Sequence, residues 1–157
     1  MSQVTATNLQ KVPLLSVIPV SGLELIAGIA DRKFLRPGEV LFQEGKPSET
    51  IFFIIEGRIA LSMRSDEGRI AKLSALEGGE VLGQMALLEN KPVHLCTAVA
   101  DAESLVIEIS AAAFQKLSEE KPKLGVTVQK IIRSDLDKKL AAAGPSLRPL
   151  LIRALAT

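Results

Sequence analysis

Apolar residues divide the chain into three parts, with helical spacing at both ends and strand-like alternation between them. In the N-terminal part, one helix face is formed by Leu23, Ile26, Ala27 and Ala30. Short helices broken by prolines are therefore predicted over residues 9–30, with Ser21 as a candidate N-cap. The mostly polar residues 1–8 are expected to be disordered.

Residues 31–110 alternate short apolar runs with turns that contain glycine. The apolar runs are VLFQ, TIFFIIE, RIALSMR, RIAKLSAL, LCTAVA and SLVIEIS. Short strands at nearly even spacing predict an antiparallel barrel or jelly roll, and Asp66-Glu67-Gly68 is typical of a hairpin tip. Residues 83–88 are the exception, because they have the pattern of one or two helical turns between strands. An insertion of this kind usually serves a function.

Helical spacing returns after Ser110. A short helix is predicted at residues 111–118, and a longer one from Pro122 to about Ala143. The longer helix has an apolar stripe at every fourth position, formed by Leu124, Val128, Ile132, Leu136 and Leu140. This stripe must face either the barrel or a second copy of the chain. Residues 144–157 begin with a Gly-Pro helix stop and form an amphipathic tail, which is expected to dock on the domain or on a partner.

The charge of the chain limits its partners. The formal net charge is +1, and there is no Trp or Tyr. Direct nucleic-acid binding is therefore not expected, because it relies on basic surfaces and, for single strands, on aromatic stacking. The charge is uneven, with a net of −4 over residues 1–114 and +5 over residues 115–157. The basic segment is either a solvated helix face or a contact surface for an acidic partner or anionic lipid.

The remaining composition favours a soluble cytoplasmic protein. The one cysteine, Cys96, excludes an internal disulfide and has the setting of an ordinary buried thiol. The apolar stretch 12–30 is interrupted by Pro13, Pro19 and Glu24, so no membrane span is predicted. The single histidine has no neighbouring carboxylate, and no cluster has metal-ligand spacing. We therefore expect no enzymatic activity, no catalytic residues and no bound metal.

A further pattern is carried by FLRPGEVLFQEG (34–45), TIFFIIEGRIAL (50–61), LGQMALLENKPVHLCTAVA (82–100) and LVIEISAAAF (105–114). In this order and spacing, the four segments resemble the cyclic-nucleotide-binding domain family, and the resemblance covers roughly residues 9–140. It implies an eight-stranded antiparallel jelly roll with N-terminal and C-terminal helices. We therefore expect a disordered start (1–8), this domain (9–143) and the amphipathic tail (144–157).

The segment 82–100 is similar to the family's phosphate-binding cassette. By that resemblance, Gly83 matches the family's glycine, the N–H of Ala86 meets the cyclic phosphate, and Gln84 takes the place of a Glu that binds the ribose. The position of the phosphate-binding Arg falls on His94, or on Val93 if the proline is aligned instead. The cofactor-binding residues implied are Gly83, Gln84, Ala86, His94, Leu95 and Thr97.

Both signature side chains thus depart from the family's pattern. Loss of the Arg is expected to weaken cyclic-phosphate binding by about 10- to 1000-fold. Gln84 can still accept a hydrogen bond from a hydroxyl, but it lacks the charge of a Glu. A protonated His94 would be a weak, pH-dependent replacement for the Arg. The alternative is an ordinary histidine with a neutral hydrogen bond.

We favour a regulatory domain that has lost tight nucleotide binding and acts through contacts with an unknown protein partner. The alternative is a functional cAMP or cGMP receptor that signals through its C-terminal helices. A DNA-binding transcription factor is disfavoured, because too few residues follow the long helix for a helix-turn-helix. No cofactor is expected apart from a weakly bound cyclic nucleotide. A homodimer through residues 124–140 or the tail at 147–155 is also considered.

Overall fold

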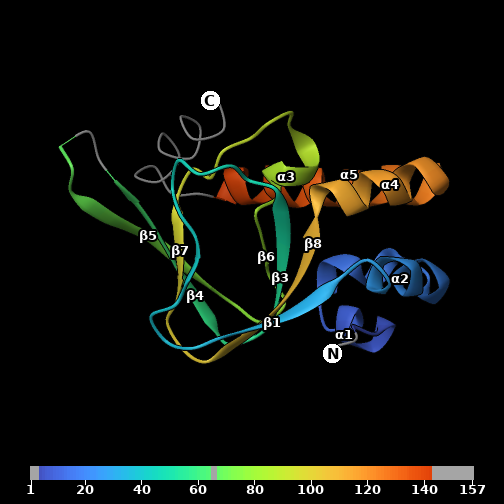
Figure 1. Ribbon diagram of the computed structural model, residues 1–157, viewed down its shortest axis with the longest axis horizontal. Coiled ribbons are helices and arrows are strands. Elements are labelled where there is room, and N and C mark those ends of the chain that lie inside the picture. The colour runs from blue at the N-terminus through green and yellow to red at the C-terminus, as the bar shows by residue number, and fades with distance from the viewer. Residues whose placement is uncertain (1–3, 65–66, 143–157) are drawn as a thin grey trace.

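The computed structural model describes residues 4–64 and 67–142, which form two packed β-sheets with helices at one end (Figure 1). The chain begins with α1 (Ala6–Gln10), the 3₁₀ helix η1 (Pro13–Val17) and α2 (Val20–Ala27). Thr5 caps α1 and Val4 is buried, which corrects the expectation of a disordered start for residues 4–8. The predicted N-cap at Ser21 is wrong, because α2 begins at Val20 with Pro19 as its N-cap.

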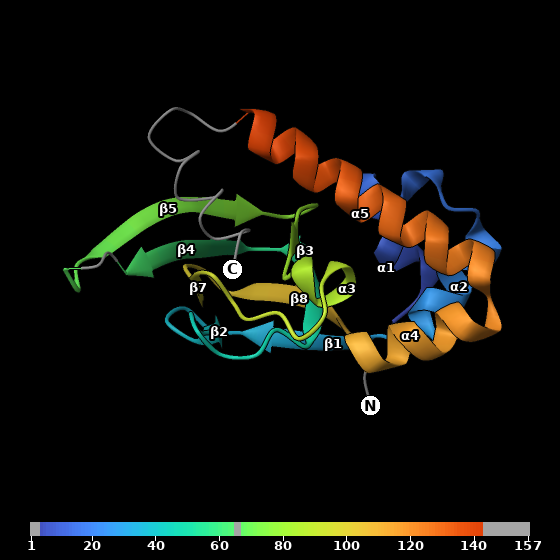
Figure 2. The ribbon, with the colours of Figure 1, turned by 90° about the horizontal axis from the view of Figure 1, so that it is seen from above.

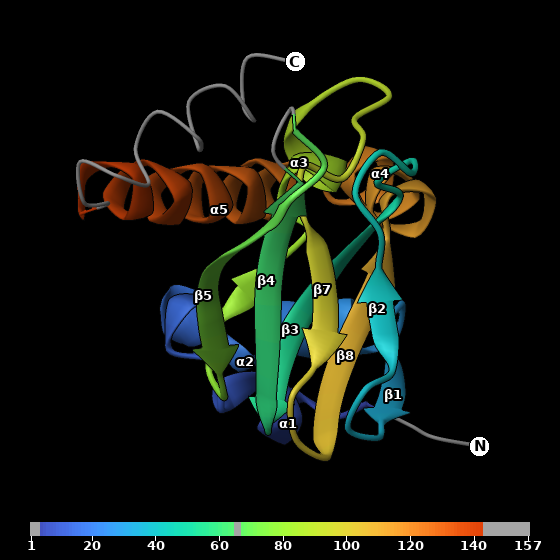
Figure 3. The same ribbon diagram turned by 90° about the vertical axis from the view of Figure 1, so that its left-hand side faces the viewer.

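Eight strands follow and confirm the predicted jelly roll. They are β1 (Asp31–Leu35), β2 (Val40–Phe42), β3 (Thr50–Glu56), β4 (Arg58–Arg64), β5 (Ile70–Glu77), β6 (Val81–Leu82), β7 (Thr97–Ala100) and β8 (Ser104–Ser110). One sheet has the order β1-β8-β3-β6 and the other β2-β7-β4-β5, and all paired strands are antiparallel (Figure 3). The predicted hairpin is the β4–β5 pair, in which Arg64 lies opposite Ile70.

Strand β3 lies inside the fold, which explains why TIFFIIE is apolar at almost every position. Ile51, Phe53 and Ile55 belong to the core that lies between this sheet and the helices. Phe52 and Ile54 point the other way, into the core between the two sheets. Because both faces of the strand are buried, the polar alternation of a surface strand is absent.

The C-terminal helices pack against the first sheet. Helix α3 (Met85–Leu88) is inserted between β6 and β7, and α4 (Ala111–Glu120) leads into the long α5 (Pro122–Ala142), which crosses the molecule beside α4 (Figure 2). Val128 and Ile132 of the predicted stripe are buried in the core between helices and sheet, and Leu124 packs against it. These three positions therefore face their own domain, whereas Leu136 is half-buried and is not part of this core. The Leu140 side chain and the tail 144–157 lie outside what the structure describes.

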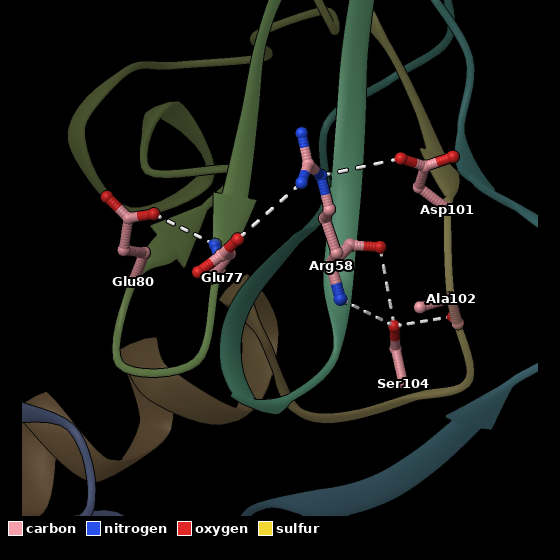
Figure 4. Close-up of polar contacts among 6 residues, drawn as sticks. All are labelled: Arg58, Glu77, Glu80, Asp101, Ala102 and Ser104. Atoms are coloured by element: carbon pink, nitrogen blue, oxygen red, sulfur yellow. Dashed lines mark hydrogen bonds and ion pairs between the residues drawn. The ribbon is translucent and has the colours of Figure 1, made fainter.

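A buried hydroxyl joins the start of β4 to the turn before β8 (Figure 4). Ser104 Oγ accepts a hydrogen bond from the main-chain N–H of Arg58 (3.1 Å) and donates one to the carbonyl of Ala102 (2.9 Å). The exposed Arg58 guanidinium lies 3.4 Å from a carboxylate oxygen of Asp101 and 3.7 Å from one of Glu77. These contacts hold two turns of the jelly roll together.

Candidate functional site

Gly83 connects β6 to α3 in a backbone conformation that favours glycine. Its φ angle is 72°, and a Cβ at this position would lie 2.5 Å from the carbonyl oxygen of Thr50 in β3. Another residue would combine left-handed strain with a backbone clash. The fold alone therefore requires this glycine, whether or not a ligand approaches it.

The four-residue helix α3 uses some of its own N–H groups. The N–H of Ala86, predicted to meet a phosphate, donates to the carbonyl of Gly83 (3.1 Å), and the N–H of Leu87 donates to that of Gln84 (3.1 Å). Ala86 and Leu87 are buried. Gln84 precedes the helix, and its side chain makes no capping hydrogen bond. Among the predicted ligand groups in this turn, the Gln84 side chain is therefore the one that makes no capping hydrogen bond to α3.

His94 is held in place by main-chain hydrogen bonds and by stacking of its ring. Its N–H donates to the carbonyl of Lys46 (2.8 Å), and its own carbonyl accepts from the N–H of Gly45 (2.7 Å). The imidazole lies parallel to the ring of Phe42, with 4.0 Å between ring centroids and 9° between planes. The residue is only 9% exposed. His94, on the segment between α3 and β7, is therefore held against the loop that follows β2.

Burial also determines the charge of His94. Desolvation lowers the pKa of the imidazole from its ordinary value, because the charged form loses its hydration. The ring is accordingly neutral at pH 7. A neutral imidazole offers one N–H donor, whereas a guanidinium offers a charged fork of five.

Aromatic rings lie between His94 and the start of the cassette. Phe42 stacks on Phe52 with 5.8 Å between centroids, and Cδ2 of Phe52 is 3.4 Å from where a Cβ of Gly83 would be. His94, Phe42 and Phe52 also line a shallow cavity of about 470 Å³, to which Gly83, Gln84 and Ala86 do not contribute. The contacts that lead from His94 to Gly83 thus pass through the rings of Phe42 and Phe52.

The last two predicted site residues are Thr97, which contacts the loop after β2, and Leu95, which lies next to His94 in the chain. Thr97 Oγ1 accepts a hydrogen bond from the main-chain N–H of Glu44 (3.0 Å), and Leu95 is half-buried. Burial and the neighbouring Glu44 carboxylate raise the pKa of the Cys96 thiol to about 11. His94 and Thr97 thus both bind residues 44–46, while Gly83 packs against β3.

Sequence reasoning missed Phe42 as the partner of His94. The run VLFQ marks a buried strand, but no local signal shows which distant side chain covers the ring. Within the described residues, no group of three His, Cys, Asp or Glu side chains could hold a metal ion. None of the helices described has the length and apolar character needed to cross a bilayer.

Comparison with known proteins identifies the domain. The family model of the Cyclic nucleotide-binding domain matches residues 32–121, more than half of the chain. A solved structure of a cyclic nucleotide-binding-like protein from Brucella abortus is 35% identical, with a TM-score of 0.62 over 73% of this chain and 97% of that one.

Two curated relatives are longer proteins. The cAMP-activated global transcriptional regulator Vfr from Pseudomonas aeruginosa is 27% identical over 124 residues, or 77% of this chain and 58% of Vfr. Lysophospholipase nte1 from Neurospora crassa is 28% identical over 95 residues, or 60% of this chain and 6% of that enzyme. The chain thus spans only part of each. The strand order, the glycine turn into α3 and the family match together show that this chain belongs to the cyclic nucleotide-binding domain family.

Proposed function

We propose that this chain is a regulatory domain that binds cyclic nucleotides weakly or not at all and acts through contacts with another protein. The observation that carries the proposal is the environment of His94. A cyclic phosphate is an anion, and the side chain at the family's Arg position is a neutral imidazole stacked on Phe42. Burying an anion without a fixed cation leaves its charge poorly compensated.

The rest of the cassette adds to this argument. The Ala86 N–H is already bonded to Gly83, so a phosphate would have to compete with that carbonyl. Gln84 accepts a hydrogen bond from a hydroxyl without the charge of a Glu, and such a neutral bond is weaker. Each departure acts at the same ligand, so their effects on affinity combine.

Contact with a protein follows from the regulatory character of the family and from the surface. Phe34 in β1 is 69% exposed, and Val40 at the start of β2 is also exposed. Both strands are at the edges of their sheets. Exposed apolar side chains on edge strands are suited to a protein interface.

The nucleotide half of the proposal is tested by calorimetric titration with cAMP and cGMP at pH 7.5 and pH 6. Dissociation constants near millimolar, or no measurable binding, are expected at pH 7.5. Submicromolar binding would instead support the alternative, a functional cAMP or cGMP receptor. Binding that appears only at pH 6 and disappears in His94→Ala would show that a protonated His94 holds the phosphate.

Two double variants test whether a positive charge at position 94, rather than the shape of the side chain, determines cAMP affinity. The double change Gln84→Glu with His94→Arg restores the family's side chains, and a guanidinium can stack on Phe42 as the imidazole does. It is expected to increase cAMP affinity at least tenfold, the value of about one charge-assisted bond. The control, Gln84→Glu with His94→Gln, adds no cation and is expected to give only the smaller gain that comes from the Gln84→Glu change. Equal gains in both variants would show that the missing Arg does not cause the weak binding.

A further inference from the structure

A groove lies behind the cassette, on the side of α3 that faces α4 and α5. Its volume is about 610 Å³, within the range of small-molecule sites. The loop between β2 and β3 supplies Ser48, α3 supplies Leu87, α4 supplies Phe114 and Gln115, and α5 supplies Gln129. His94, Gln84 and Thr97 do not line it, although Ala86 of the predicted site does, so the groove lies on the other side of the cassette helix.

One wall of the groove contains a polar group without a partner. Ser48 is 3% exposed, and its Oγ makes no hydrogen bond to any described residue. Its main-chain N–H is satisfied, since it donates to the carbonyl of Pro92 (2.8 Å). A buried hydroxyl without a partner is costly, and rotation about a serine χ1 is a small movement. A bound molecule with a hydrogen-bonding group would therefore remove that cost.

A second serine of the groove differs from Ser48 in this respect. Ser118 of α4 also lines the groove, but its Oγ donates to the carbonyl of Phe114 (2.9 Å). Gln129 is likewise engaged, because its Nε2 donates to the carbonyl of Leu87 (3.1 Å). Ser48 is thus the lining hydroxyl for which a ligand would supply the first hydrogen bond.

The other lining residues indicate the character of the ligand. Buried Ala86, Leu87 and Phe114 provide apolar walls. The charged side chains are Glu49, Glu89 and Lys91, so acidic groups outnumber basic ones and an anion is disfavoured. We propose that this groove is a second binding site, for a small uncharged molecule with an apolar body and an amide- or carbonyl-type head that bonds to Ser48.

Such a ligand contacts Ala86 and Leu87 from behind the cassette, together with α4 and α5. The site does not depend on whether the cassette binds a nucleotide. Benzamide serves as the probe, because it joins an apolar ring to an uncharged amide. The full chain labelled with ¹⁵N is titrated with benzamide, and the amide shifts of Ser48, Leu87 and Phe114 are followed by NMR. Saturable shifts centred on these residues are expected.

The variants decide whether Ser48 is the anchor. Ser48→Ala is expected to weaken benzamide binding about fivefold, the usual contribution of one neutral hydrogen bond. Ser118→Ala is the matched control and is expected to leave affinity unchanged, since that hydroxyl is already bonded within α4. Val93→Trp, at an exposed wall position, is expected to block the groove without unfolding the domain. Retained dispersion of the amide spectrum shows that each variant is folded.

Three results would overturn the proposal. The first is benzamide shifts that fail to saturate or that scatter over the surface. The second is an equal loss of affinity in Ser48→Ala and Ser118→Ala. The third is tighter binding of benzoate than of benzamide, which would mark an anion site rather than one for an uncharged molecule. Addition of excess cAMP to the sample is expected to leave the benzamide-induced shifts unchanged. This experiment can therefore fail or succeed independently of the test of nucleotide binding.

Discussion

The side-chain amide of Gln129 donates a hydrogen bond to the main-chain carbonyl of Leu87, with 3.1 Å between Nε2 and the oxygen. This bond joins α5 to the cassette helix α3, two segments far apart in the chain. Leu87 is buried, so its carbonyl depends on this donor more than a surface carbonyl would. The contact ties the position of the short helix to that of the long one.

Gln129→Met keeps the length of the side chain and removes the donor. The free energy of unfolding is expected to fall by about 0.5–1.5 kcal/mol, the usual net value of one hydrogen bond. Urea denaturation measures this change. Lys130→Met is the matched control at the next, exposed position, and its effect is expected to stay within about 0.5 kcal/mol. Equal losses in the two variants would mean that the Gln129 bond contributes nothing specific.

The pH dependence of stability is expected to report the burial of His94. Because burial lowers the pKa of the folded-state imidazole, the unfolded chain takes up a proton more readily. The stability due to the neutral ring is therefore complete above the unfolded-state pKa of about 6.5. It is lost as the pH falls below that value toward the folded-state pKa.

His94→Phe keeps a ring against Phe42 but cannot take up a proton. Between pH 7.5 and pH 5.5, urea denaturation is expected to show a smaller loss of stability in this variant than in the unmodified chain. Carboxyl groups titrate alike in both proteins, so the difference between the two curves isolates His94. Parallel curves would contradict the assignment of a lowered pKa to this residue.

Cys96 is expected to react slowly with a thiol reagent such as Ellman's reagent. Its pKa is raised from 9.0 to about 11, first by burial and then by the Glu44 carboxylate. At pH 8 this lowers the thiolate fraction about 100-fold, and the greater nucleophilicity of a more basic thiolate recovers about tenfold. The folded protein is thus expected to react at least about tenfold more slowly than the chain in urea.

The Glu44→Gln variant tests the electrostatic part of this effect. Glutamine keeps an oxygen that can accept the hydrogen bond from the Arg64 N–H, which Glu44 now accepts at 2.9 Å. Loss of the negative charge is expected to lower the pKa of Cys96 and to speed the reaction modestly. A folded protein that reacts as fast as the unfolded chain would contradict the burial of the thiol.

Much of the fold could be predicted because its signals are local. Glycine turns between short apolar runs marked the strands, and the β4–β5 pairing confirms the hairpin. The helix face of Leu23 and Ile26 was also correct, since both are buried. The start of the folded domain was harder to predict. Thr5 caps α1 by accepting a hydrogen bond from the N–H of Asn8, and composition alone does not reveal this contact.

The cassette could be aligned in the sequence by resemblance, but the surroundings of its side chains could not be predicted. The alignment of His94 with the Arg position came from the resemblance, whereas its lowered pKa comes from burial, and β2 brings Phe42 against its ring. Ser48 gave no signal at all, since an ordinary serine and an unpartnered buried one look alike in a sequence. Contacts between distant segments decide both properties, and periodicity does not encode them.

The apolar stripe of α5 gives the last prediction, because the sequence left open whether it faces the domain or a second copy. Ile132 is fully buried, whereas Val126, on another face of the same helix, is 49% exposed. Ile132→Ala is expected to lower the free energy of unfolding by about 2–5 kcal/mol, because it leaves a cavity between helices and sheet. Val126→Ala is expected to change it by less than about 0.5 kcal/mol.

Thermal unfolding of both variants at several protein concentrations separates the two readings of the stripe. Burial within one domain predicts a midpoint that does not change with concentration, since no association is coupled to folding. A stripe that stabilises the chain by pairing two copies would instead give a midpoint that rises with concentration. In that case the dependence of the midpoint on protein concentration would disappear in Ile132→Ala. This pair of results would overturn the assignment of α5 to the core of its own domain.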